Sequence, residues 1–219
     1  MVDVVGEKRR AAEAAASLVE AGMSVGLGTG STVAELLVVL AARRLEIRCV
    51  ATSFETEAAA TALGLAVAPF GAIERLDLAI DGADQVAPDG WLVKGGGAAH
   101  TREKVVAAAA DRFVVVVDST KPVPALRPPV PLELLEFGHA STLRRLEAIG
   151  PVRRRAVGPS PDGGVICDYL GPVDDAVGLA AALGAVPGVV EHGLFPPALV
   201  SDVVVGTGDD VEWRAVSTR

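Results

Sequence analysis

The segment LVKGGGAAHTREK, residues Leu92–Lys104, places a cation, bare backbone and a carboxylate close together. Three consecutive glycines cost conformational entropy on folding and contribute no packing, so they are expected where backbone amides face a small anion or a developing oxyanion. Lys94 adds positive charge directly before Gly95–Gly97, and Glu103 falls in the first turn of an expected helix, where a carboxylate complements the helix dipole. The segment therefore indicates a site for a small anionic ligand. The alternatives are a solvated strand end for Lys94 and a simple helix-start acid for Glu103.

Two further polar segments come directly after apolar segments that are expected to be strands. IDGADQV places Asp81 and Asp84 at the carboxyl end of one strand, where ligands bind in open α/β sheets. Asp-Gly is also a common turn sequence, which accounts for one of the two aspartates. DSTK places Lys121 after another strand, where it could close on a phosphate group or belong to a surface turn before proline.

A glycine-rich segment, GLGTGST (Gly26–Thr32), joins an expected strand to an expected helix. Its glycines allow close approach of a ligand, and free N–H groups at a helix start attract phosphate. The segment matches neither the Walker loop nor the dinucleotide-binding fingerprint. The alternative is a tight turn in which Ser31 or Thr32 caps the helix. Because all four polar segments follow strands or precede helices, we expect them to share one edge of a sheet.

The helices and strands that must position these residues can be read from the sequence pattern. The expected strands are continuous apolar runs, in which apolar and polar residues do not alternate, and expected helices lie between them. This pattern predicts an α/β fold with an open, mostly parallel sheet flanked by helices. Thr52-x-x-Glu55 matches a capping box and predicts a helix start. The expected strands are residues 23–27, 47–51, 65–69, 76–80, 91–93 and 113–117, and the expected helices are residues 7–20, 32–44, 52–64 and 101–112.

The second part of the chain has a different pattern. Half of the residues from Pro122 to Pro131 are proline, which predicts a stiff, extended connection. Beyond it, strands and helices follow in the order βαββαβ, which is typical of a ferredoxin-like fold, with 159–164 as a hairpin loop. Strands 203–205 and 211–216 could return to the first sheet. We expect an α/β catalytic domain of residues 1–128 plus 200–219 and a ferredoxin-like α+β subdomain of residues 129–199. The expected elements of the subdomain are strands 131–137, 152–157, 164–169 and 188–194 and helices 141–149 and 174–184.

The formal net charge of −8 argues against general nucleic-acid binding, because phosphate contacts need a basic surface. The one basic cluster, Arg153–Arg155, is short and is interpreted as a solvated strand or rim. The N-terminal segment is charged where a signal peptide needs an apolar core, and no uncharged apolar run reaches the roughly 18 residues of a membrane span. We therefore expect a soluble, cytoplasmic protein with neither nucleic-acid nor membrane partners.

Cysteine and histidine give no metal-site pattern. Cys49 and Cys167 lie in apolar runs and are interpreted as buried free thiols. His100, His139 and His192 show neither metal-ligand spacing nor a Ser/His/Asp arrangement, and the last two are interpreted as structural.

Lysine is rare, and only four of the 20 basic residues are lysine. A chain so biased to arginine would keep lysine where a compact ammonium is needed. For Lys8 and Lys104, however, chance is the preferred interpretation.

The segments GLGTGST, DGAD, KGGGAAxTREK and DSTK, in this order, resemble ribose-5-phosphate isomerases of type A. The likeness covers nearly the whole chain, including the ferredoxin-like insert and the GLF segment Gly193–Phe195. It implies interconversion of D-ribose 5-phosphate and D-ribulose 5-phosphate through an enediolate, in the non-oxidative pentose phosphate pathway. It also implies that no metal or cofactor takes part, and that the enzyme is a homodimer or homotetramer.

The resemblance also assigns roles. Glu103 is implied as the base, Lys94 and the glycine amides as stabilisers of the enediolate, and Asp81 and Asp84 as acid–base groups for ring opening and hydroxyl protons. His100 departs from the family pattern, which has an apolar residue there. The implied substrate-binding residues are Thr29, Gly30, Ser31, Thr32, Asp81, Gly82, Ala83, Asp84, Lys94, Gly95, Gly96, Gly97 and Lys121, with the threonine-containing loop and Lys121 as the phosphate anchor.

Two other classes of function stay open at this point. An amino-sugar-phosphate deaminase, a phosphosugar lactonase or a CoA-transferase could share a related fold, but the ferredoxin-like insert and the KGGG/TREK pair count against them. A phosphosugar-sensing module of a transcription regulator is the non-enzyme alternative. Only 22 residues precede the first expected strand, too few for a typical DNA-binding domain.

Overall fold

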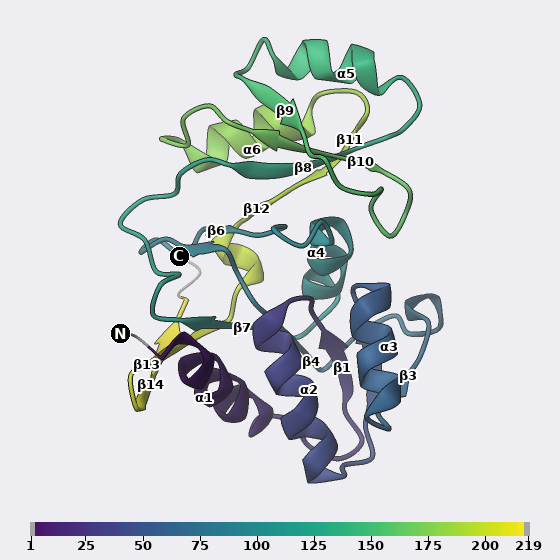
Figure 1. Cartoon of the computed structure of the whole chain (residues 1–219), viewed down its shortest axis with the longest axis vertical. Coiled ribbons are helices and arrows are strands. Elements are labelled where there is room, and N and C mark those ends of the chain that lie inside the picture. Colours follow the sequence, from purple (N-terminus) through teal and green to yellow (C-terminus); the bar gives the residue numbers. More distant parts are fainter. Residues whose placement is uncertain (1–2, 217–219) are drawn as a thin grey trace. The chain divides into compact units, whose positions relative to one another are not determined.

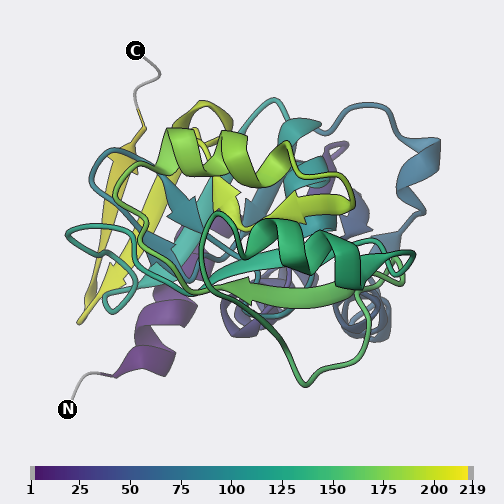
Figure 2. The ribbon, with the colours of Figure 1, turned by 90° about the horizontal axis from the view of Figure 1, so that it is seen from above.

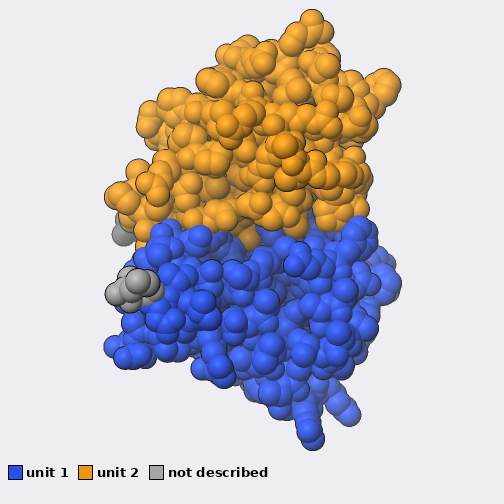
Figure 3. Space-filling view, viewed as in Figure 1, with its two compact units in different colours: residues 1–83, 102–121, 197–219 blue, residues 84–101, 122–196 orange. Residues whose placement is uncertain are grey.

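The computed structural model describes residues 3–216 of the chain, and the chain divides into two compact units. Unit 1 comprises residues 1–83, 102–121 and 197–219, and unit 2 comprises residues 84–101 and 122–196 (Figure 3). The division predicted from the sequence, into residues 1–128 plus 200–219 and residues 129–199, stays a prediction. Residues 1–2 and 217–219 of the first predicted domain lie outside the described structure.

Unit 1 is built on a seven-stranded sheet in the order β14-β13-β7-β4-β1-β2-β3 (Figure 1). All neighbouring strands run parallel except β14, which pairs antiparallel with β13. The predicted mostly parallel sheet is confirmed, and so is the return of the two C-terminal strands. The strands are β1 (Ser24–Leu27), β2 (Arg48–Ala51), β3 (Ala66–Val67), β4 (Leu78–Asp81), β7 (Phe113–Asp118), β13 (Asp202–Thr207) and β14 (Asp210–Ala215).

One face of this sheet forms a core with α1 (Val4–Ala16) and α2 (Ser31–Arg43). Successive side chains of a strand point to opposite faces, so alternate residues such as Val25 and Leu27 enter this core. The alanines of α1, Ala11, Ala12, Ala15 and Ala16, are fully buried in it. Helix α3 (Phe54–Ala62) and the short 3-10 turns η1 (Phe70–Ala72) and η2 (Pro197–Leu199) complete the unit.

Helix α4 (His100–Ala108) begins in unit 2 and continues in unit 1. Within unit 1 its Val106 packs on β1 at Gly26, where a Cβ would lie 2.4 Å from Val106 Cγ1. Gly26 therefore lets the helix approach the strand closely. The first turn of the same helix carries Glu103.

Unit 2 has the predicted ferredoxin-like order. Its four-stranded antiparallel sheet has the order β11-β8-β10-β9, and α5 and α6 pack in one core with it (Figure 1, Figure 2). The elements are β8 (Val130–Leu134), α5 (His139–Leu146), β9 (Val152–Arg154), β10 (Val165–Tyr169), α6 (Ala176–Gly184) and β11 (Val189–His192). A smaller sheet in the order β12-β6-β5 contains β5 (Gln85–Val86), β6 (Leu92–Val93) and β12 (Leu194–Phe195).

The second face of the four-stranded sheet carries polar groups. Leu132 and Cys167 point into the core with α5 and α6, so their neighbours Glu133 and Asp168 point to the opposite face. Both carboxylate residues are nevertheless buried. The polar turn at 159–164 contributes to this face, because the Ser160 hydroxyl donates to the Glu133 carboxylate.

Several sequence predictions need correction. The capping box at Thr52 is wrong, because α3 is capped by Ser53, whose Oγ accepts from Thr56 N at 3.1 Å. Strand 65–69 shortens to β3, and helix 101–112 ends at Ala108. The interpretation of Arg153–Arg155 as solvated holds for the first two residues but not for Arg155, whose side chain is 15% exposed and paired with Asp168.

Cys49 and Cys167 are buried free thiols, as predicted, and burial raises the pKa of each to about 11. Neutral thiols of this kind act as small apolar side chains. No helix within residues 3–216 combines the length and the apolar content that a membrane crossing requires.

Candidate active site

The loops that follow β1, β4 and β7 lie side by side in unit 1, because these strands are neighbours and run parallel. The loops contain Gly28–Thr32, Gly82 and Ser119–Lys121. The prediction that all four polar segments share one sheet edge is confirmed for these three only, because the Lys94–Gly97 segment follows β6, a strand of the smaller sheet in unit 2. In open α/β sheets this edge is where ligands bind.

Asp81 is enclosed by the glycine-rich loop. A Cβ on Gly28 would lie 1.9 Å from Asp81 Cγ, so only glycine fits beside this carboxylate. Asp81 Oδ1 accepts hydrogen bonds from Thr29 N at 3.1 Å and from Gly82 N at 2.7 Å. These contacts fix the orientation of a buried carboxylate at the end of β4.

The start of α2 is open to an anion. Its N-cap is Gly30, with φ of 119°, and no side chain caps the helix. The alternative in which Ser31 or Thr32 caps the helix is therefore wrong. Because the first N–H groups of a helix have no partner within the helix, this loop can offer amides and the partial positive charge of a helix start to a phosphate.

Lys8 extends from α1 to the same loop. Its Nζ donates to Ser31 Oγ at 3.0 Å and lies 3.9 Å from Asp118 Oδ2. Asp118 Oδ1 in turn accepts from Thr120 N at 2.9 Å and from the Thr120 hydroxyl, which orders the turn that leads to Lys121. The preference for chance at Lys8 stays an interpretation of the sequence, and the structure adds that its ammonium contacts the loop before α2.

Glu7, the neighbour of Lys8, was missed altogether in the sequence. It is buried, and it accepts from Gly208 N at 2.8 Å, from Ser119 Oγ at 2.7 Å and from Ser119 N at 3.1 Å. The Gly208 amide, followed by the Ser119 hydroxyl, lowers the pKa of this carboxyl below its ordinary value. Glu7 therefore joins α1, the Ser119–Lys121 turn and the β13–β14 hairpin.

In unit 2, Lys94 follows β6 directly and is buried. Its N donates to Gly193 O at 2.8 Å, and its Nζ lies 5.4 Å from the centroid of the Phe195 ring. A cation over an aromatic face is attracted by the ring electrons. The alternative of a solvated strand end is therefore wrong for Lys94.

The glycine segment after Lys94 forms a tight loop. Gly95 has φ of 105°, and a Cβ there would lie 2.7 Å from His100 Nδ1. Gly96 N donates to Asp84 Oδ2 at 2.8 Å, while Asp84 N donates to Val93 O at 2.8 Å. Unit 2 thus brings together the four predicted site residues Asp84 and Gly95–Gly97 with Lys94, and Gly96 and Gly97 are exposed.

Helix α4 begins at His100, so His100 and Glu103 occupy one helical face, three residues apart. Both residues are buried. His100 Nε2 lies 3.4 Å from Glu191 O, and the Thr101 hydroxyl donates to the Glu133 carboxylate. The prediction that Glu103 stands in the first turn of a helix is confirmed.

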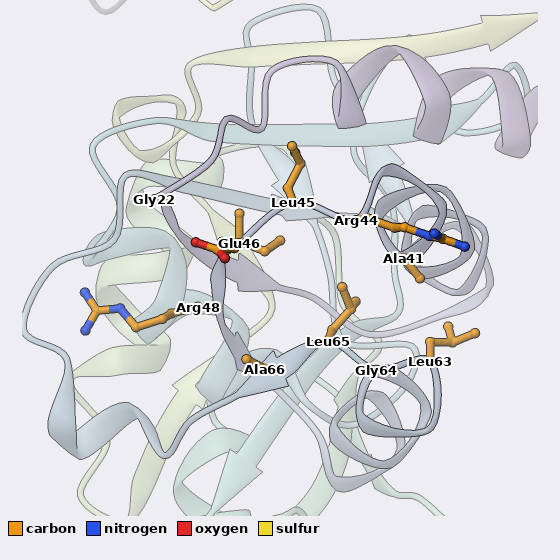
Figure 4. Close-up of a pocket in the computed structure, with 11 residues that line it drawn as sticks. Gly22, Ala41, Arg44, Leu45, Glu46, Arg48, Leu63, Gly64, Leu65 and Ala66 are labelled. Atoms are coloured by element: carbon orange, nitrogen blue, oxygen red, sulfur yellow. The ribbon is translucent and has the colours of Figure 1, made fainter.

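The predicted site residues thus form two groups, one in each unit, and α4 carries Glu103. A cavity of about 670 Å³ in unit 1 contains none of them (Figure 4). It is lined by residues near the amino ends of β1, β2 and β3, including Gly22, Glu46 and Ala66. Within the described part of the chain, no three His, Cys, Asp or Glu side chains form a group that could hold a metal ion.

Comparison with known proteins gives a consistent result over nearly the whole chain. A family model described as ribose 5-phosphate isomerase A (phosphoriboisomerase A) matches residues 48–210. The chain is 47% identical over 218 residues to ribose-5-phosphate isomerase A of Halobacterium salinarum, covering 95% of each protein.

Solved structures agree with this result. The structure of ribose 5-phosphate isomerase A from Methanocaldococcus jannaschii matches with a TM-score of 0.90 and 34% identity, covering 95% of this chain and 97% of that one. A structure of D-ribose-5-phosphate isomerase in complex with phospho-erythronic acid matches with a TM-score of 0.90 and 32% identity, covering 97% of this chain and 99% of that one.

Proposed function

The chain belongs to the ribose-5-phosphate isomerase A family, and on that premise we propose that it interconverts D-ribose 5-phosphate and D-ribulose 5-phosphate. The observation that carries the proposal is the loop of unit 2, in which Lys94, three glycines and Asp84 are folded together. The reaction is an aldose–ketose isomerisation, which belongs to the non-oxidative pentose phosphate pathway.

Such an isomerase moves a proton between C2 and C1 of the open-chain sugar through an enediolate. A base removes the C2 proton of the aldose and returns a proton to C1, while the carbonyl oxygen at C1 gains a proton and the C2 hydroxyl loses one. We assign the base to Glu103, as the family resemblance implies, because it is a buried carboxylate in the first turn of α4.

The negative charge that develops on the C1 and C2 oxygens of the enediolate must be stabilised by donors that are already in position. The Lys94 ammonium supplies a positive charge, and its contact with the Phe195 ring keeps it in position. The Gly96 amide donates to Asp84, so its part is to orient that carboxylate. The role of oxyanion donor then falls to Lys94 together with the Gly97 amide.

Asp81 and Asp84 suit the remaining proton transfers, which are the opening of the furanose ring and the movement of hydroxyl protons. Asp81 is fixed by two amides, and Asp84 by the Gly96 amide. We propose that Ala83 and Gly82, which connect the two aspartates, contact substrate through their backbone.

The phosphate anchor is proposed at the carboxyl edge of unit 1. In the segment Thr29–Thr32, the residues after Thr29 supply amides at the uncapped start of α2 and the Thr and Ser side chains supply hydroxyls, while Lys121 supplies a cation from the β7 turn. The hydrogen bond from the Lys8 ammonium to Ser31 Oγ supports including this lysine in the proposed anchor. A dianionic phosphate is bound well by such charge-assisted hydrogen bonds.

The assembly is proposed to be a homodimer or homotetramer in the cytoplasm, as the family resemblance implies. Light scattering of the purified protein during gel filtration measures the mass of the assembly directly. A mass of one chain at assay concentration would contradict the proposal.

The test of the function is formation of ketose from ribose 5-phosphate by the purified protein, with free ribose as the comparison substrate. We expect turnover of the phosphate ester and very poor turnover of ribose. Hydroxylamine treatment in the presence of acyl-CoA serves as the second measurement. A covalent glutamyl adduct without ketose formation would assign the chain to the transferases instead.

A further inference from the structure

Arg155 connects the ferredoxin-like sheet of unit 2 to the glycine loop. Its Nη1 donates to Gly95 O at 2.8 Å and to Gly96 O at 3.2 Å. On its other side, Nε donates to both carboxylate oxygens of Asp168 at 2.9 Å, and Nη2 donates to Asp168 Oδ1 at 2.6 Å. The planar guanidinium is therefore fixed by a carboxylate on one side and holds two consecutive carbonyl groups on the other.

These contacts determine where the loop amides point. In a trans peptide the C=O and the following N–H point in opposite directions. The Gly95–Gly96 peptide is held at both ends, because its oxygen accepts from Arg155 and its N–H donates to Asp84 Oδ2 at 2.8 Å. The oxygen of the next peptide also accepts from Arg155, so the Gly97 N–H is directed away from the guanidinium.

The loop needs such a restraint. Glycine adopts many backbone conformations, so peptide planes between glycines reorient easily unless they are bound. Gly95 is already in the left-handed region, with φ of 105°, and Ala98 also has a positive φ, of 61°. Three glycines in a row have no side chains to pack, so without a restraint the oxyanion donors would lack a fixed direction.

The burial of the Arg155–Asp168 ion pair supports a role in orienting the Arg155 side chain. The side chains of Arg155 and Asp168 are 15% and 7% exposed. Replacing a buried pair of this kind by apolar residues is often neutral for stability, since removing both charges from water is costly. The pair is better explained by the direction it gives to the Nη1 donor than by its contribution to the folding free energy.

We propose that Arg155, held by Asp168, is a positioning residue that aligns the Gly96 and Gly97 amides and Asp84 for stabilisation of the enediolate. The proposal rests on the function proposed above for the glycine loop. It gives the ferredoxin-like subdomain a part in the reaction, because both charged residues belong to its β9–β10 region. The guanidinium also polarises the two peptides, which strengthens their N–H groups as donors.

The test compares variants of Arg155 with a matched control in the same run of arginines. Arg155→Met removes the donors and keeps an unbranched side chain, and the double variant Arg155→Met/Asp168→Leu also avoids an unpaired buried carboxylate. Arg154→Met is the control, because Arg154 is exposed in β9. Arg155→Lys keeps the charge but loses the planar fork.

We expect the double variant to unfold at nearly the wild-type temperature. Its kcat should fall by roughly tenfold or more, toward the ~100-fold effect of a small misplacement of catalytic groups, while KM changes by less than about threefold. Arg155→Lys should be intermediate, and Arg154→Met should match the wild type. Hydrogen exchange at residues 92–101 should accelerate in Arg155→Met and in the double variant but not in Arg154→Met, which a stability effect alone would not produce in the double variant.

Two outcomes contradict the inference. Wild-type kcat together with wild-type exchange in the double variant would overturn it, and so would a rise in KM at unchanged kcat, which would make Arg155 a binding residue. Lys94→Ala, assayed in parallel, distinguishes a failure of the inference about Arg155 from a failure of the proposed function. If Lys94→Ala retains wild-type turnover, the role of the loop itself is wrong; if it loses turnover while the double variant does not, only the inference about Arg155 is wrong.

Discussion

Glu7, Glu103 and Glu133 all have buried side chains, and their different surroundings indicate different roles. Glu7 accepts from the amide of Gly208 and from Ser119, and Glu133 accepts from the hydroxyls of Thr101 and Ser160. Both therefore hold loops in place. Glu103, in the first turn of α4, is the one that the family resemblance assigns to proton transfer.

Lys121→Ala tests the phosphate anchor at the scale of one side chain. The phosphate group of the substrate is remote from C1 and C2. Removing its contact with Lys121 should therefore raise KM more than it lowers kcat, although remote binding energy also supports kcat. Steady-state kinetics with ribose 5-phosphate measure both constants. Arg144→Ala, which removes an exposed cation from α5, is the charge-matched control. Loss of kcat alone would move Lys121 into the proton-transfer site.

Gly28→Ala tests the close approach of backbone and Asp81. The added methyl group would lie 1.9 Å from Asp81 Cγ, so the carboxylate must move and we expect kcat to fall by roughly 10²-fold. Gly71→Ala is the control, because a Cβ there meets no atom within 4 Å. Equal activity of the two variants would show that the position of Asp81 is unimportant for the reaction.

At the scale of elements, the periodicity of the sequence predicts the order and type of nearly all helices and strands, because apolar runs determine them locally. It fails at boundaries such as Thr52, where the adjacent Ser53 supplies the cap and the Thr52 hydroxyl instead lies 2.8 Å from Thr29 Oγ1. The contacts of Glu7 with Ser119 join residues 112 apart in sequence, and no local pattern reveals such pairs.

Glu7 should make the attachment of α1 dependent on pH. Because its hydrogen bonds lower the pKa of the folded carboxyl below 4.5, the stabilisation is fully present above that value and is lost as the pH falls through the folded pKa. Glu7→Gln should therefore lower the free energy of unfolding by about 1–3 kcal/mol at pH 7.

Denaturant unfolding of both proteins between pH 3 and pH 7 measures this dependence. The difference between wild type and Glu7→Gln should shrink as the pH falls below 4.5. Arg9→Gln, an exposed change on the same helix, should show no such convergence. A constant difference at every pH would contradict a role for the charge of Glu7.

At the scale of the whole molecule, the motifs in the sequence predict the family, which the comparisons then establish over nearly the full chain. The motifs do not predict which side chains contact the site residues, because these contacts depend on how each unit folds. Arg155 is the clearest case, because a run of three arginines gives no indication that the third one is buried against Asp168.

The intact enzyme should turn over without a metal ion. We expect kcat with ribose 5-phosphate to be unchanged after exhaustive chelation, because the proposed charge stabilisation comes from Lys94 and backbone amides. Activity before and after EDTA treatment and dialysis measures this. A loss of activity that an added divalent ion restores would overturn the metal-free mechanism.

The central claim is that Glu103 transfers the proton, and turnover of ribose 5-phosphate in heavy water tests it most directly. Glu103→Gln should lower kcat by roughly 10²–10⁴-fold and abolish exchange of the transferred hydrogen with solvent. His100→Leu, which restores the apolar residue of the family pattern, should change kcat by less than about tenfold, or roughly 1.4 kcal/mol in barrier. Retained exchange in Glu103→Gln together with its collapse in His100→Leu would contradict the account and assign the proton transfer to His100.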